Sequence, residues 1–100
     1  MSVSTTVSSD ENEVTIQVTG RFDFSTHRDF VKAYKEYPKG AVSFVVDLQG
    51  ADYMDSSAMG MLLQLREYGK SDVNIRLING NEGILEILRI ANFEKLFTIE

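Results

Sequence analysis

The spacing of hydrophobic residues divides the chain into segments typical of strands and segments typical of helices. Apolar residues alternate with serine, threonine or glutamine over residues 3–7 and 14–18, which predicts two strands joined by a turn at residues 10–12. Residues 42–48 are almost continuously apolar, a pattern typical of a strand covered on both faces. The alternation returns over residues 73–77 and predicts a further strand.

Helical spacing is found between these strands. Apolar residues recur three and four positions apart over residues 30–37, about 56–68 and about 84–91, and three helices are therefore predicted. Asp23 or Ser25 is placed to cap the first helix. The final residues, 93–99, are expected to form an extended or irregular tail with a possible last strand.

The predicted element order is ββαβαβα. Helices that connect successive strands imply parallel crossovers, since a short turn joins only antiparallel strands. We therefore predict the α/β class, with a mixed, mostly parallel sheet and helices packed on it. The sequence contains no repeat or linker, and residues 1–100 are expected to form a single domain.

Composition excludes several classes of function. The chain has no cysteine and a single histidine, His27, which argues against a metal site or a disulfide framework. A formal net charge of -5 makes nucleic acid an unfavourable partner. The sequence shows neither a signal peptide nor an apolar stretch long enough to span a membrane. We expect a cytoplasmic protein without cofactors that is monomeric alone.

The residues that follow Leu48 are polar, and we expect a loop that ends where Ser56 and Ser57 open the second helix. Free backbone N–H groups and the positive end of the helix dipole make such a place favourable for a phosphate. Ser56 is therefore a candidate phosphorylation site. The alternative is that Asp55, Ser56 and Ser57 only cap the helix, because aspartate and serine are common there for stability alone.

The second helix carries more apolar surface than a single contact requires. Four residues share the face that should pack on the sheet, namely Ala58, Met61, Leu62 and Leu65. Met59 and Leu63 lie on the shoulder of that face, which is explained either by a broad core contact or by a partner surface. We take Met54, Ala58, Met59 and Leu63 as the candidate partner-binding residues.

Catalysis by these serines is not expected. A serine nucleophile needs an adjacent base, and His27 lies at the start of a different helix. The sequence lacks the Gly-x-Ser-x-Gly pattern of a nucleophile elbow and the glycine-rich loop of a phosphate-binding P-loop. We predict that the chain is not an enzyme.

Two motifs and the order of elements resemble the STAS domain, and within it the bacterial anti-sigma-factor antagonists. The motifs are Gly20-x-Phe22-Asp23 and the block from Met54 to Gly60, which reads Met-Asp-Ser-Ser-Ala-x-Gly. The resemblance covers essentially the whole chain. Family members usually continue into a last helix where this sequence reads Thr98-Ile99-Glu100, so we expect that helix to be shortened or absent.

The resemblance implies a phosphorylation switch. The serine that follows the aspartate maps to Ser56, and a partner that is both anti-sigma factor and serine kinase would phosphorylate it. The unphosphorylated form would bind that partner, and a serine phosphatase of the metal-dependent type would reset the switch. Asp23, Asp55 and Ser57 map to the surroundings of the phosphorylation site. The alternative is a STAS-like signalling module with another regulatory partner or a small-molecule ligand.

Overall fold

The computed structural model describes residues 2–10 and 12–100, so Glu11, in the expected turn, lies outside the described residues. Its strands form one sheet in the order β1-β2-β3-β4-β5. β1 pairs antiparallel with β2, and the other neighbours are parallel. The strands are β1 Ser2–Val7, β2 Glu13–Phe22, β3 Ser43–Met54, β4 Arg76–Ile78 and β5 Thr98–Ile99. This confirms the predicted mixed, mostly parallel sheet.

Helices connect the parallel strands as predicted. They are η1 Phe24–Thr26 and α1 His27–Lys35 after β2, α2 Ser56–Tyr68 after β3, and α3 Glu82–Ile90 with the short η2 Phe93–Lys95 after β4. The possible last strand is present as β5, which pairs with β4. β5 is the last element of the described part of the chain.

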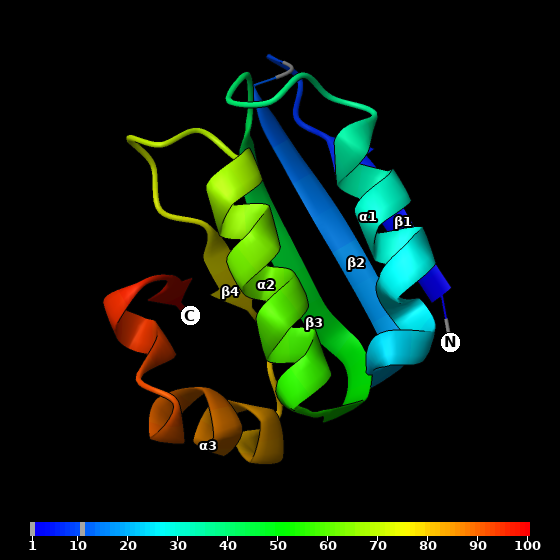
Figure 1. Ribbon diagram of the computed structural model, residues 1–100, viewed down its shortest axis with the longest axis vertical. Helices are drawn as coiled ribbons and strands as arrows, with labels where there is room; N and C mark the ends of the chain where they lie inside the picture. Colours follow the sequence, from blue (N-terminus) through cyan, green and yellow to red (C-terminus); the bar gives the residue numbers. More distant parts are fainter. Residues whose placement is uncertain (1, 11) are drawn as a thin grey trace.

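The core lies on one face of the sheet. α1 and α2 lie side by side across that face, and α3 lies beyond the end of the sheet at which β2 and β3 finish (Figure 1). Along β2 the residues alternate, with Val14, Ile16 and Val18 buried and the intervening side chains partly exposed. A strand that packs on one side only gives this alternation.

β3 was expected to be covered on both faces, and residues 44–46 are indeed all buried, but helices cover only one of the two faces (Figure 1). Phe44, Val46 and Leu48 belong to the core beneath the helices, whereas Val45 is buried but lies outside that core cluster. Its neighbours in register are Thr15 on β2 and Arg76 on β4. Val45 is therefore covered by side chains of adjacent strands and not by a second layer of helices.

β3 is also longer than predicted. The residues after Leu48 continue the strand as far as Met54, where a polar loop was expected. Their pairing with the end of β2 compensates for their polar character, and it includes two shifts of register before Phe22 meets Met54. The consequence is that β2 and β3 end together, one residue before Asp23 and Asp55.

Candidate functional site

Three helix starts gather at the carboxyl-terminal edge of the parallel strands. Asp23 caps η1, Asp55 caps α2 and Asn81 caps α3, each through a side-chain oxygen that accepts a backbone N–H. These residues follow β2, β3 and β4 respectively. In α/β sheets, ligands and partners commonly bind outside the carboxyl ends of the strands. The candidate site is therefore at this edge of the molecule.

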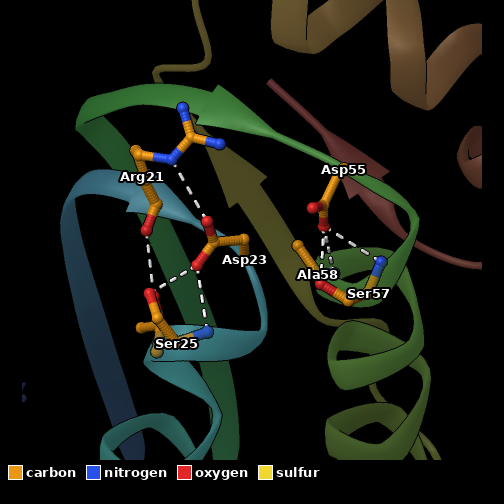
Figure 2. Close-up of polar contacts among 7 residues, drawn as sticks. Arg21, Asp23, Ser25, Asp55, Ser57 and Ala58 are labelled. Carbon is orange, nitrogen blue, oxygen red and sulfur yellow. Dashed lines mark hydrogen bonds and ion pairs between the residues drawn. The ribbon is translucent and has the colours of Figure 1, made fainter.

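The start of α2 is held by Asp55. Its carboxylate accepts the N–H of Ser57 at 3.0 Å and that of Ala58 at 3.3 Å, and the Ser57 hydroxyl donates to the same oxygen at 2.6 Å (Figure 2). These contacts satisfy two of the backbone donors that a helix leaves free at its N-terminus. Asp55 and Ser57 thus perform the capping.

Ser56 is the first residue of α2, directly after the cap, and its side chain is exposed. Among the residues that the structure describes, its hydroxyl makes no hydrogen bond, in contrast to the hydroxyl of Ser57. Capping of α2 therefore does not require Ser56. Its hydroxyl stands free at the positive end of a 13-residue helix.

Asp23 repeats this geometry at the end of β2. Its carboxylate accepts both the N–H and the hydroxyl of Ser25, and the Arg21 guanidinium lies 3.2 Å from it (Figure 2). Arg21 also lies over the ring of Tyr53, 3.8 Å from its centroid. The Ser25 hydroxyl, followed by the Ser25 amide and Arg21, holds the pKa of Asp23 below its usual 3.8 despite partial desolvation. Asp23 caps η1, whereas the residue before α1 is Thr26, whose side chain makes no capping hydrogen bond, so the prediction that Asp23 or Ser25 caps the first α-helix was wrong.

The predicted partner-binding residues fall into two groups. Met54 is 2% exposed, at the edge of a cleft of about 200 Å³ between β3 and α3, and Ala58 is fully buried against the sheet. Neither presents a side chain that a partner could cover, because both face the core. Met59 is partly exposed and Leu63 is 39% exposed. The predicted partner surface on α2 therefore narrows to Met59 and Leu63, and it stays a prediction.

His27 is the first residue of α1, and Ser56 is the first residue of α2. The His27 ring stacks on Phe24, with 4.9 Å between the ring centroids. Asp55, the neighbouring carboxylate, accepts from Ser57. Within residues 2–10 and 12–100, no group of three or more His, Asp or Glu side chains is arranged to hold a metal ion. In the same residues, no helix combines the length and apolar character needed to cross a membrane.

Phe24 is the residue of this edge that sequence reasoning missed. It is 68% exposed and lies between Asp23 and Ser25, as Ser56 lies between Asp55 and Ser57. The repeated pattern Asp-x-Ser at the ends of two strands was a signal in the sequence that could have drawn attention to it. Without that comparison, the sequence shows Phe24 only as an apolar residue that precedes a helix.

Sequence comparison identifies relatives over the whole length of the chain. Residues 5–98 match the protein family described as Mlab, STAS domain. A STAS-domain containing protein of Pseudomonas aeruginosa strain UCBPP-PA14 is 46% identical over 100 residues, which cover 99% of each chain.

Solved structures with the same fold include anti-sigma factor antagonists. A Thermotoga maritima protein described as a candidate antagonist has a TM-score of 0.81 at 18% identity, over 97% of this chain and 84% of that one. The antagonist SpoIIAA in its unphosphorylated form has a TM-score of 0.69 at 18% identity, over 99% of this chain and 87% of that one. The phosphorylated form of Bacillus SpoIIAA has a TM-score of 0.67 at 17% identity, over 99% of this chain and 91% of that one. The chain belongs to the STAS domain family and has the fold of the SpoIIAA-like anti-sigma factor antagonists.

Proposed function

We propose that this STAS domain is an anti-sigma-factor antagonist controlled by phosphorylation of Ser56. In the unphosphorylated form it binds an anti-sigma factor that is also a serine kinase, and phosphorylation releases that partner. The observation that carries the proposal is the exposed Ser56 hydroxyl, which stands at the start of α2 without a capping role. The likeness to SpoIIAA, a protein solved in phosphorylated and unphosphorylated forms, supports the same reading.

The switch acts through charge. A phosphate on Ser56 adds about -1.5 to -2 charge at neutral pH. The helix N-terminus offsets part of this charge, so the fold is expected to change little. At an interface the same group must lose its water beside Asp55 and the exposed Asp52. An unpaired buried charge costs about 3–5 kcal/mol, which corresponds to a hundredfold or greater loss of affinity.

The remaining parts of the cycle follow from the same proposal. Met59 and Leu63 contact the partner beside Ser56, while Asp23, Asp55 and Ser57 shape the loop that the kinase and phosphatase must recognise. A serine phosphatase of the metal-dependent type restores the binding form. The cycle operates in the bacterial cytoplasm and controls transcription through the released sigma factor.

The test is phosphopeptide mapping of the protein taken from its own cells in two growth states. We expect one phosphoryl group, on Ser56, whose occupancy differs between the states. Ser57 and Ser25 are internal controls, because their hydroxyls donate to Asp55 and Asp23. In pull-downs, Ser56→Ala should retain the kinase and Ser56→Asp should lose it. Equal recovery with both variants contradicts the proposal.

A second candidate function is ligand binding. An open hollow of about 390 Å³ lies between α1 and α2, and its lining includes His27, Tyr34, Gln64 and Tyr68. A small molecule or another regulatory partner could bind there without any phosphate. Absence of phosphate on Ser56 in both growth states, together with nucleotide binding in a titration, would favour this second candidate.

A further inference from the structure

Phe24 occupies in one connection the place that Ser56 occupies in the next. Phe22 and Met54 are directly paired at the ends of β2 and β3, and an aspartate cap follows each. The backbone angles of the caps are nearly the same, with φ -141° and ψ -169° for Asp23, and φ -132° and ψ -173° for Asp55. Figure 2 shows the two caps side by side. The residues after the caps, Phe24 and Ser56, therefore project from the same edge.

The ring of Phe24 is exposed and has one aromatic neighbour, His27. Only about a third of its surface is covered, since it is 68% exposed, yet it stacks on His27 with an angle of 18° between the rings. An exposed aromatic residue contributes little to the fold, whereas aromatic side chains dominate the energetics of interfaces. A ring that is already held in place loses less freedom on binding than a mobile one.

We infer that Phe24, supported by His27, is the apolar anchor by which the serine kinase that modifies Ser56 binds this domain. The inference rests on the proposed phosphorylation switch and adds to it a specific contact. α1 and α2 lie side by side, and packed helices have axes about 8–10 Å apart. An ordinary protein interface covers about 800 Å² of each partner. A kinase site that closes on Ser56 must then also cover Phe24.

The charges at this edge define the partner further. Asp55 directly precedes Ser56 and the exposed Asp52 lies four positions before it on β3, while Arg21 is paired with Asp23 and stacked on Tyr53. The matching surface of the kinase is an apolar pocket for Phe24 with a cationic rim for the acidic side chains. Because the Phe24 contact excludes water next to Ser56, it also makes a phosphate there more costly to bury.

Photo-crosslinking in the protein's own cells tests the contact with the full chain. p-Benzoylphenylalanine is placed at position 24 or, as a control, at position 90. Ile90 is 73% exposed but lies at the last residue of α3. We expect position 24 to form an adduct with a protein that phosphorylates Ser56 in vitro, and position 90 to form none with it. In the Ser56→Asp background the adduct should fall at least tenfold.

A kinetic measurement with the captured kinase and ATP completes the test. Phe24→Ala should lower kcat/KM for phosphorylation of Ser56 at least about tenfold, the effect typical of an anchor residue. Phe24→Leu should recover part of the loss, and Ile90→Ala should leave the rate unchanged. The urea midpoints of the three variants show that each is folded.

The outcomes separate this inference from the proposed function. If Ser56 carries phosphate in cells but Phe24→Ala is phosphorylated like the wild type, the anchor is wrong and the switch stands. An adduct at position 24 that is insensitive to Ser56→Asp also overturns the anchor, because the contact then belongs to another partner. If Ser56 is never phosphorylated, both fall together.

Discussion

The β2–α1 and β3–α2 connections are built alike and differ in one exposed residue. In each, an aspartate accepts both the backbone N–H and the hydroxyl of the serine two residues later. The residue between them is Phe24 in the first connection and Ser56 in the second, and both are exposed. The cap fixes the turn without using the residue that follows it. That position is free to carry an apolar contact in one connection and a modifiable hydroxyl in the other.

The two caps also support helical segments of different length. Asp55 begins a 13-residue α-helix and accepts two backbone N–H groups, whereas Asp23 begins a three-residue 3-10 turn and accepts one. The serine connection is therefore the more firmly anchored of the two. In the proposed switch, these two hydrogen bonds hold the start of α2 so that the Ser56 hydroxyl faces the kinase in one orientation.

The largest effect is expected from the residues that hold both connections together. Phe22 is fully buried at the end of β2 and pairs with Met54 of β3. Phe22→Ala should lower the free energy of unfolding by about 3–5 kcal/mol, because it leaves a cavity beneath both caps. Urea denaturation followed by circular dichroism measures the loss.

Phe24→Ala is the matched control, since it makes the same truncation two residues later at a side chain that is 68% exposed. Its unfolding free energy should stay within about 0.5 kcal/mol of the wild type. Similar losses of unfolding free energy for the two variants would mean that Phe24 is a core residue. Phe24 and Ser56 could then no longer be compared as two exposed residues that follow equivalent caps.

The loss of unfolding free energy on removing a cap should increase with the number of backbone N–H groups that the cap accepts. Asp55→Ala should cost about 1 kcal/mol of unfolding free energy, within a usual range of about 0.5–2 kcal/mol, and Asp55→Asn should retain most of the stability. Asp23→Ala should cost less, because Asp23 accepts a single N–H of a short turn. Urea denaturation of the three variants gives the order, and a larger loss for Asp23→Ala would contradict it.

The two serines of α2 provide the sharpest test of the role given to Ser56. Ser57→Ala removes the 2.6 Å hydrogen bond to Asp55 and should cost about 0.5–1 kcal/mol. Ser56→Ala removes no hydrogen bond within the described residues and should change the unfolding free energy by less than about 0.5 kcal/mol. Equal losses of unfolding free energy for Ser56→Ala and Ser57→Ala, measured by urea denaturation, would indicate that Ser56 also caps the helix.

Periodicity predicted the helices well because it reports directly on burial. The four residues assigned to the inner face of α2, Ala58, Met61, Leu62 and Leu65, are all buried. Asn81 and Gly69 mark helix ends as their residue types indicate. Such features depend on neighbours within a few positions, so the sequence alone contains the information.

Features set by distant partners could not be predicted in this way. Residues 49–54 contain glycine and aspartate and resemble a loop, but their pairing with β2 makes them a strand. The burial of Val45 depends on Thr15 and Arg76, which are far away in the sequence. The likeness of the Phe24 and Ser56 positions likewise depends on the register between two strands.

The smallest effect concerns the charge of the Asp23 cap. The Ser25 hydroxyl is the strongest influence that holds the pKa of this carboxyl below 3.8, and Arg21 contributes less. Ser25→Ala should therefore raise the pKa toward its usual value, and Arg21→Gln should raise it by a smaller amount. Carbon-detected NMR titration of the Asp23 carboxyl measures both shifts.

The sign of the linked stability follows from the lowered pKa. A carboxyl with a lower pKa in the folded chain contributes stability above its unfolded pKa of about 3.9, and that contribution disappears as the pH falls through the folded pKa. The urea midpoint of Ser25→Ala should accordingly depend less on pH below about 4 than that of the wild type. A larger shift of the pKa in Arg21→Gln than in Ser25→Ala would show that the ion pair, and not the serine, controls this cap.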